Sequence, residues 1–516
     1  MSGLALKLPR ISRDVVVALS LLLASGVAAV VQGQDANIDL YRYRLYIGYA
    51  FVHHRLDLDL APAALGTYLN PVLDAAHYLG IVHLPPRVFG FLVGTFQGLN
   101  AVLVFFMARR LLPGERDSRL LAVLAGVLAA SGPTARSLLG TTLGDTTVSV
   151  PALLALLLVL GDQRVPDQRT GVSLLLGAGF LAGAAVALKL TMAAPLVALG
   201  AVVALGVASC RVKLGATLTF FGGSAAGYLA LAGYWCWQLW KRFGNPIFPF
   251  ANQIFQSPYL PAQAFRDSRW IGESPMDYLS PPFDMALGMT ARLQEIPFRE
   301  ARFLLVLLAG LAWVGLRLSG RRGSLSPGQR GLLVFVLVGY ATWAVAFYYY
   351  RYAAVLEFLA PLALVILVNA VLPRLARPVL VAATTVLLVS SSVGSWGRLP
   401  WGERWFYIRL PPQAYEPDSL VLVDSPLSSF LIPYFPPATR FAGLEGAESA
   451  RFEELLGARI ASHRGPVMWL VSRGRPAEST SPGRFGVVVS DDCGVIRTGE
   501  GRWALCRVVR PGGPRG

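Results

Sequence analysis

Uncharged apolar stretches, most of them close to 18 residues long, recur along this chain of 516 residues and constrain its fold more than any other feature. A helix needs roughly 20 apolar residues to cross about 30 Å of hydrocarbon. The stretches lie near residues 15–33, 88–108, 119–135, 146–161, 171–188, 191–209, 214–237, 301–316, 331–348, 353–372 and 378–396. Because charged residues make up only 15% of the chain, a set of water-soluble domains is excluded. The sequence predicts a mostly α-helical, polytopic membrane bundle of about eleven helices.

Lys and Arg residues are concentrated in alternate connections between these stretches. With the N-terminus assigned inside, 17 of them fall in the inside segments, whereas the three short outside connections hold only Arg136, Lys189 and Arg351. Basic residues are retained on the cytoplasmic side during insertion. We therefore expect a multi-pass protein of the bacterial inner (cytoplasmic) membrane with a cytoplasmic N-terminus. The net charge of +16 reflects this bias and gives no reason to expect nucleic acid as a partner.

Three longer segments are predicted outside, at 34–87, 241–300 and 398–516. In the last, apolar runs at 419–424, 467–472, 485–490 and 503–509 indicate buried strands, and 448–461 has helical spacing. We predict a transmembrane domain over 1–397 and a small C-terminal extracytoplasmic (periplasmic) α/β domain over 398–516. The spacing of Cys493 and Cys506 leaves open whether they form a disulfide or stay free.

The first outside segment carries acids close to the membrane surface. Asp35 and Asp39 lie within six residues of the end of the first apolar stretch. A carboxylate next to a low-dielectric environment costs free energy unless it is paired, so both are functional candidates. One Asp there can act as general base toward a sugar or lipid hydroxyl. Arg42 and Arg44 leave a simpler alternative open, in which Asp39 is only an ion-pair partner.

Two helices are expected beyond these acids, one within 41–52 and a second after Asn70 and Pro71. Both suit helices that lie on the membrane surface with Tyr at the headgroup level. An amphipathic plug without chemistry explains this pattern equally well.

Several motifs along the chain resemble one family. They are DLYRYRLYIGYAF (39–51), APAALGTYLNPVLD (61–74), GTTLGD (140–145), ALKLT (187–191), FGNPIFPFANQIFQSP (243–258), RD (266–267) and RYAAVLEFLAPL (351–362). These motifs are similar to those of a group of bacterial integral-membrane proteins in the C-type (GT-C) glycosyltransferase superfamily. The resemblance spans most of the chain and becomes weaker in the C-terminal segment 398–516, which we call the tail.

The resemblance implies an inverting glycosyltransferase of the cell envelope. Such an enzyme moves a sugar, a hexose or pentose, from a polyprenyl-phosphate donor to an extracytoplasmic glycan, lipid or protein acceptor. By resemblance Asp39 occupies the place of the catalytic base. Leu40 follows it where a second acid is more familiar, so Asp35 stays a rival.

A departing lipid phosphate develops negative charge, which cations at the outer membrane face would stabilise. Lys189, Arg266 and Arg351 are expected there, and Arg44 and Asn70 are further candidate substrate-binding residues. Any single cation among them is equally compatible with an ordinary interface residue whose head reaches toward water.

Three more polar residues are candidates for substrate contact. Glu357 lies inside the tenth apolar stretch, so it should face the protein interior, and we prefer a role in orienting Arg351 or Arg136. Asp145 begins the fourth stretch, where a helix N-cap is an equally good reading. Asn252 lies in a proline-interrupted loop whose amides and aromatic rings suit either sugars or the interface.

Four of the five His residues share the first outside segment with acids, but their spacing matches no compact metal motif. We expect no cofactor, and a divalent metal is not favoured. Nucleotide-binding fingerprints are absent from the sequence, which disfavours a nucleotide-sugar donor. Two alternatives stay open: a transporter or flippase of lipid-linked sugars, and a non-catalytic protein of envelope assembly. Transporters tend to show internal repeats and midplane charges, and here we find no repeat and little midplane charge besides Glu357.

Overall fold

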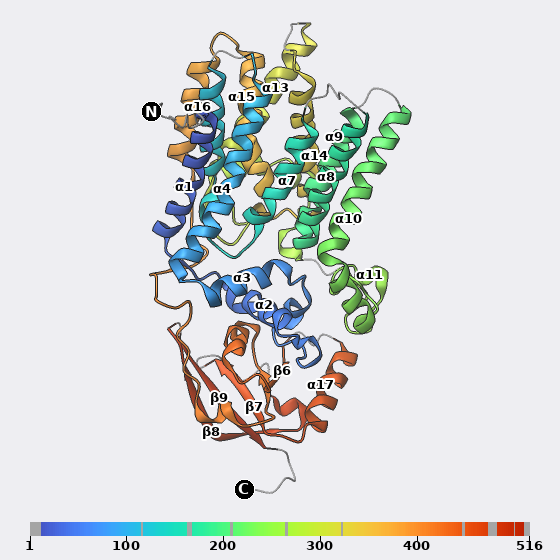
Figure 1. The fold of residues 1–516 in the computed structure, drawn as a ribbon, viewed down its shortest axis with the longest axis vertical. Coiled ribbons are helices and arrows are strands. Elements are labelled where there is room, and N and C mark those ends of the chain that lie inside the picture. The colour runs from blue at the N-terminus through green and yellow to red at the C-terminus, as the bar shows by residue number, and fades with distance from the viewer. Residues whose placement is uncertain are drawn as a thin grey trace, which may run out of the picture.

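The computed structural model describes residues 12–114, 117–161, 168–206, 210–263, 267–320, 324–445, 449–472, 482–499 and 501–509. A bundle of long helices forms one end of the molecule and a β-sheet the other, with the first outside segment between them (Figure 1). We call the end of the bundle that faces the sheet its tail side.

Each of the eleven predicted stretches forms a helix. These helices are α1 (Arg13–Gln32), α4 (Pro86–Leu111), α5 (Ser118–Ala130), α7 (Asp145–Val159), α8 (Gln168–Leu188), α9 (Ala193–Gly206), α10 (Cys210–Phe243), α13 (Arg302–Leu318), α14 (Pro327–Ala346), α15 (Ala354–Val371) and α16 (Ala376–Ser390). By length and composition, six helical segments of the described chain suit a membrane span, and they lie in α1, α4, α8, α10, α14 and α15. The predicted fold class, a polytopic helix bundle with a small C-terminal α/β domain, is confirmed.

Of the remaining helices, α5, α7, α9 and α16 are shorter than the predicted stretches, whereas α13 is not. The 13 residues of α5 extend about 20 Å, which is less than the hydrocarbon thickness. Between α5 and α7 the chain is largely non-helical and buried, apart from the short α6 (Pro133–Ser137). Non-helical backbone near the membrane is tolerated where protein covers it. This connection brings polar groups to the tail side of the bundle.

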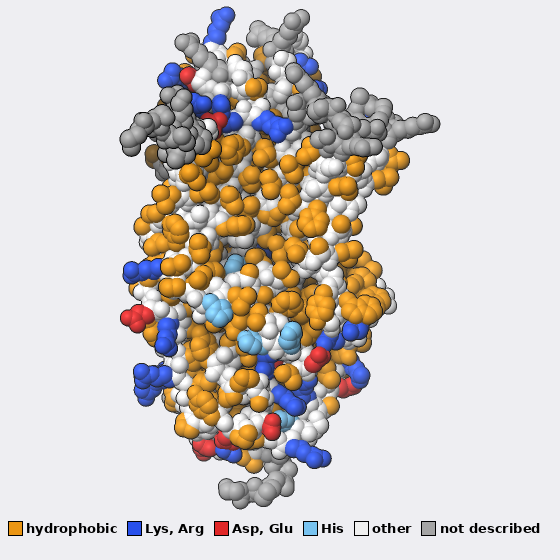
Figure 2. All heavy atoms as spheres, viewed as in Figure 1, with side chains coloured by type: hydrophobic (Ala, Val, Ile, Leu, Met, Phe, Trp, Pro, Cys, Tyr) orange, Lys and Arg blue, Asp and Glu red, His pale blue; other side chains and the backbone are white. Residues whose placement is uncertain are grey.

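Charge is distributed along the molecule as the loop composition predicts. Apolar side chains cover the helix bundle, whereas charged side chains gather toward the two ends (Figure 2). At the end away from the sheet, Asp14 accepts hydrogen bonds from Arg109 at 3.1 Å and Arg119 at 2.9 Å. The chain is therefore a multi-pass membrane protein, and the side of the membrane that each end occupies stays a prediction.

The first outside segment forms the two predicted helices, α2 (Leu45–Val52) and α3 (Val72–His83). Tyr46 and Tyr49 of α2 are buried inside the protein, so the expectation that they lie at the headgroup level is wrong. A π-helical turn, Leu40–Arg44, precedes α2. The core of this segment continues into the tail, where Tyr46 and Ile47 share a hydrophobic cluster with Phe430. The predicted boundary after residue 397 therefore does not separate two independent cores.

The tail contains a five-stranded sheet of order β6-β5-β7-β9-β8. Its elements are β5 (Leu420–Val423), β6 (Arg440–Gly443), α17 (Ala450–Ser462), β7 (Val467–Ser472), β8 (Val488–Arg497) and β9 (Arg502–Val509). β6, β5 and β7 are parallel, and β9 and β8 continue the sheet antiparallel. The prediction of strands β5, β7 and β9 and of the helix is confirmed, whereas β6 was not predicted.

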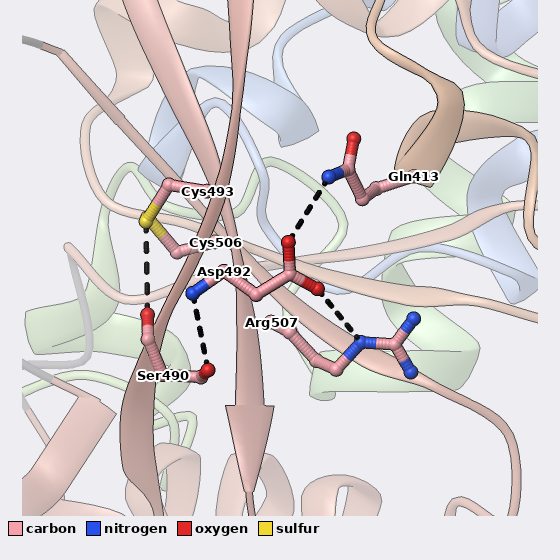
Figure 3. The surroundings of a disulfide bond; sticks show 6 residues. All are labelled: Gln413, Ser490, Asp492, Cys493, Cys506 and Arg507. Atoms are coloured by element: carbon pink, nitrogen blue, oxygen red, sulfur yellow. Dashed lines mark hydrogen bonds and ion pairs between the residues drawn. A yellow bond between two sulfur atoms is a disulfide. The ribbon is translucent and has the colours of Figure 1, made fainter.

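The expected buried strand at 485–490 is wrong, because β8 begins at Val488 and forms a largely exposed edge of the sheet. A disulfide between Cys493 and Cys506 joins β8 to β9, which resolves the alternative that the spacing left open (Figure 3). Beside it, the Asp492 carboxylate accepts a hydrogen bond from Gln413 and lies 3.5 Å from Arg507.

Two pairs of short strands fasten the tail side of the bundle. β1 (Gln34–Asp35) pairs with β4 (Arg398–Leu399), and β2 (Phe298–Arg299) pairs with β3 (Ser392–Val393). Two short helices, α11 (Asn252–Phe255) and α12 (Pro281–Leu287), lie in the second outside segment. The strand pairs fix the ends of α1 and α16 and so position the residues that follow β1.

Candidate functional site

Asp39 lies where the chain leaves β1 and enters the π-helical turn. Its side chain is 17% exposed, and its Oδ2 lies 3.5 Å from Nη2 of Arg351. π-helical turns are rare and occur frequently at functional sites. The partial exposure leaves one side of this carboxylate open to another molecule.

A single buried carboxylate connects two cations next to Asp39. Asp145 forms an ion pair with each cation: its Oδ1 lies 2.6 Å from Nζ of Lys189, and its Oδ2 lies 3.2 Å from Nε of Arg351. Asp145 itself is fully buried. We call Asp39, Asp145, Lys189 and Arg351 the outer cluster. It joins residues that are more than 300 positions apart in the sequence.

Local backbone geometry explains how Asp145 reaches both cations. It is the first residue of α7, and the N-cap is Gly144, whose φ of 86° suits glycine. The alternative reading of Asp145 as an N-cap is therefore wrong, and its oxygens are left for the cations. Lys189 occupies the tip between α8 and the turn that starts α9, as the sequence predicted, and also donates to the Leu143 carbonyl oxygen.

Aromatic rings hold the guanidinium of Arg351 in place. Its centre lies 4.9 Å from the ring of Trp396, 5.4 Å from Tyr349 and 5.7 Å from Tyr352. The ring faces attract a cation electrostatically, and they restrict its rotation. The donors of Arg351 that do not face Asp145 are thereby presented toward Asp39.

The outer cluster keeps Asp39 ionised. Burial alone would raise the pKa of Asp39, but the nearby charges of Arg351, Arg44 and, less strongly, Lys189 outweigh burial and hold that pKa below its usual value. For Lys189 the balance is different. Burial lowers the pKa of its ammonium to about 8, although Asp145 acts in the opposite direction.

Arg44 pairs with a different acid from the one that the sequence suggested. Its Nη1 lies 2.9 Å from Oδ1 of Asp74 on α3, and both side chains are buried. The proposed ion pair between Arg44 and Asp39 is therefore not formed directly. Burial also lowers the pKa of the neighbouring His77 to about 3, so this imidazole is neutral.

Asp35, the rival of Asp39, is fully occupied by hydrogen bonds. Its carboxylate accepts from the backbone and side-chain nitrogens of Asn37 and from the amide and hydroxyl of Thr142. Its side chain is buried. This arrangement ties β1 to the connection before α7 and leaves no open side for a substrate.

The two candidate asparagines hold backbone groups. The Asn70 amide donates to the carbonyl oxygens of Ala187 and Leu231, which links the first outside segment to α8 and α10. The Asn252 amide donates to three carbonyl oxygens of its own loop, at Ser257, Leu260 and Pro261. The amide nitrogens of both residues are thus committed to the protein itself.

Glu357 is buried on α15 and caps α6. Its carboxylate accepts from the backbone amides of Thr134 and Ala135, each at 2.9 Å, and from the Tyr350 hydroxyl. None of these contacts is to Arg351 or Arg136, so the orienting role that we expected for Glu357 stays a prediction. Nearby, Arg302 pairs with Glu300 at 2.9 Å. We call Glu300, Arg302, Tyr350 and Glu357 the inner cluster.

The other two candidate cations are not part of the outer cluster as described. Arg136 donates to the Ser391 carbonyl oxygen at 3.3 Å. Arg266 lies outside the described residues. Within the part of the chain that the structure describes, no three His, Cys, Asp or Glu side chains are grouped to hold a metal ion. Sequence reasoning did not find Trp396, and we see no sequence signal that would have marked it.

Together the bundle, the helices α2 and α3 and the outer cluster define a class of membrane protein with a polar, partly open site on its tail side. No protein-family model and no curated protein sequence matches the chain. Among solved structures, ArnT from Cupriavidus metallidurans bound to undecaprenyl phosphate is similar, with a TM-score of 0.54 and 13% identity over 97% of this chain and 98% of that chain.

The chain therefore shares the fold of that ArnT structure, in agreement with the fold that the resemblance of the sequence motifs implied. The oligosaccharyltransferase of Archaeoglobus fulgidus in the apo form matches with a TM-score of 0.45 and 12% identity over 88% of this chain and 69% of that chain.

Proposed function

We propose that the protein is an inverting glycosyltransferase that uses a sugar linked to polyprenyl phosphate. The observation that carries this proposal is the outer cluster, where a partly open carboxylate stands 3.5 Å from a guanidinium held by a second, buried carboxylate. The GT-C fold supports it, since the similar ArnT structure contains undecaprenyl phosphate. We place the site at the extracytoplasmic face of a bacterial inner membrane.

In this proposal the donor phosphate binds between Arg351 and Lys189. The contact of Arg351 with Asp39 is the longest of the three ion pairs in the outer cluster, so it is the one a phosphate most readily replaces. Asp145 keeps both cations in place while this exchange occurs. The cations then stabilise the negative charge that develops on the departing phosphate.

The exchange also prepares Asp39 to act as base. A base works best when its pKa lies near the working pH, and the free site holds the pKa of Asp39 low. A bound phosphate neutralises Arg351 and Lys189 and so removes two of the three cationic causes of the low pKa, which raises the pKa of Asp39. Asp39 then accepts the proton of the acceptor hydroxyl as that oxygen attacks the anomeric carbon and the bond to phosphate breaks.

The acceptor in this proposal is an extracytoplasmic glycan, lipid or protein, and the step needs no cofactor. The site residues that we assign are Asp39 as base, Arg351 and Lys189 as phosphate contacts, and Asp145 as a positioning residue. Asp35, Asn70, Asn252 and Glu357 support the architecture around them through the hydrogen bonds described above.

The test is complementation of a deletion strain of the source bacterium. Mass spectrometry of envelope lipids and glycans should show a sugar that is lost on deletion and restored by the wild type, but not by Asp39→Asn. The matched control is Asp57→Asn, an exposed acid of the same segment that pairs with Arg242 and should restore the sugar. Restoration by Asp39→Asn at normal protein levels would refute the proposal.

A further inference from the structure

A groove of about 1110 Å³ lies between α3, the start of α4 and the tail, on different residues from the outer cluster. One wall carries the aromatic side chains of residues 405–407 together with Tyr434, and the end of α3 forms another. Neither Asp39 nor Arg351 lines it. The groove and the candidate site nevertheless share elements, because Leu45 of the groove follows Arg44 and α3 also carries Asp74.

Three arginines form a row across neighbouring strands at one side of this groove. Arg409 and Arg497 exchange two backbone hydrogen bonds, of 3.0 and 3.2 Å, so they lie directly opposite each other. On the next strand Arg502 is the direct partner of Arg497. Directly paired residues project from the same face of a sheet. All three are exposed, and the first two line the groove.

No carboxylate of the described residues forms an ion pair with this row. The contrast with Arg507 on the same sheet is informative, because that residue pairs with Glu416 at 2.5 Å and with Asp492 at 3.5 Å. Arg404, which also lines the groove, likewise forms no ion pair with a described residue. Like charges placed directly opposite each other destabilise a sheet. The row is therefore a surface that an external anion would stabilise.

Aromatic faces accompany these charges. Tyr407 is 50% exposed and Tyr434 is 40% exposed, and both line the groove. An aromatic ring presents an apolar face on which the C–H face of a pyranose can lie. Guanidinium groups bind carboxylate and phosphate oxygens with paired donors. Glu403 also lines the groove, but Arg404, Arg409 and Arg497 outnumber it. Rings and a net positive charge in one groove of this size suit an acidic oligosaccharide better than a neutral glycan.

We propose that this groove binds the acidic glycan part of the acceptor, a sugar chain that bears carboxylate or phosphate groups. The inference rests on the proposed function, since it assigns the acceptor class for the same transferase. The groove binds this chain without taking part in the chemistry, and its arginines act as contacts for the anionic groups.

Direct binding tests the inference independently of transfer. The probes are a linear tetramer of galacturonic acid and neutral maltotetraose, titrated against the full-length protein in nanodiscs of phosphatidylcholine. The acidic tetramer should bind and the neutral one should not. Double charge reversal, Arg409→Glu with Arg497→Glu, should weaken binding about tenfold or more. Raising the salt concentration should weaken it further, because salt screens exposed charges.

Two controls keep the test decisive. Arg440→Glu changes an exposed arginine on β6, at the opposite edge of the sheet, and should leave binding unchanged. The neutral pair Arg409→Gln with Arg497→Gln should weaken binding even where charge reversal impairs folding. Three outcomes would each overturn the inference. The wild type and both double variants could bind the acidic tetramer equally, the wild type could fail to bind it, or phosphatidylglycerol nanodiscs could displace the bound tetramer.

Asp39→Asn separates this inference from the proposed function. That variant should bind the acidic tetramer as the wild type does, because Asp39 does not line the groove. If the wild type binds the tetramer and the Asp39→Asn variant still transfers sugar, the proposed mechanism is wrong, but the groove assignment stands. If Asp39→Asn abolishes transfer but the wild type does not bind the tetramer, the groove assignment is wrong, but the proposed mechanism stands.

Discussion

The outer and inner clusters both combine carboxylates with arginine near the start of α15, yet they differ in how their charges are satisfied. In the inner cluster, Glu357 receives two backbone amides and a tyrosine hydroxyl and is fully buried. In the outer cluster, Asp39 lies 3.5 Å from Arg351, has a side-chain hydrogen bond with Tyr43 and remains partly exposed. A buried charge requires partners, and a group that lacks a full set is available to a ligand. Position next to the membrane therefore does not by itself determine whether a carboxylate is closed by protein partners or left available to a ligand.

The largest difference between the two clusters is expected when one carboxylate in each is neutralised. Glu357→Gln places a donor NH2 group against the backbone N–H donors of Thr134 and Ala135. It also removes a negative charge near the buried guanidinium of Arg302. We expect a loss of about 3 kcal/mol in the free energy of unfolding. Asp39→Asn should lower that free energy by less, at most about 1 kcal/mol, because it loses only one long ion pair at a partly exposed position.

Unfolding in mixed detergent micelles, followed by tryptophan fluorescence, measures both changes. Phe358→Leu, a neighbouring buried substitution on α15, controls for general damage to the helix. An Asp39→Asn variant that is as unstable as Glu357→Gln would mean that the two clusters have the same structural role.

A second prediction concerns Asp145, which holds the two cations of the outer cluster. Asp145→Asn removes the charge that fixes Lys189 and Arg351 but preserves the side-chain shape. We expect the affinity for a polyprenyl phosphate to fall about tenfold, because two donors lose their common partner. Binding of undecaprenyl phosphate in nanodiscs provides the measurement.

Asp14→Asn is a suitable control, since it also breaks two arginine contacts but at the opposite end of the bundle. Its affinity for the lipid should match that of the wild type. If Asp145→Asn binds the lipid as tightly as the wild type, Asp145 does not position the cations.

The smallest expected effect is a pH dependence that only the outer cluster should show. The pKa of Lys189 is lowered to about 8, so its ammonium loses its charge as the pH rises through that value. Donor binding should weaken above pH 8, and kcat/KM should fall about tenfold per pH unit at most. Asp39 should cause no fall in kcat/KM between pH 5 and 7, because its lowered pKa keeps its carboxylate ionised over that range.

Lys189→Arg tests this assignment because arginine stays charged over the whole range. The fall in kcat/KM above pH 8 should disappear in this variant, whatever its activity at pH 7. If kcat/KM of Lys189→Arg still falls above pH 8, a group other than Lys189 causes that fall.

Much of the fold could be predicted because the relevant signals are local. Apolar length and loop charge indicated eleven helices, and each of them is present. Short continuous apolar runs indicated three of the five tail strands. β6 was missed because four residues, Arg440–Gly443, carry too short a pattern, and β8 was placed too early because an edge strand need not be apolar on both faces.

The sequence by itself determined that this chain crosses a membrane and that Asp35, Asp39, Asp145, Lys189 and Arg351 lie toward one end of it. It left Asp35 and Asp39 as rivals, since both are acids just beyond the first helix. Only the tertiary structure separated them. Thr142, 107 positions from Asp35, supplies the hydrogen bonds that close that carboxylate, and Arg351, 312 positions from Asp39, faces the open one. Hydrogen-bond supply and burial depend on contacts between distant segments, and no local pattern encodes them.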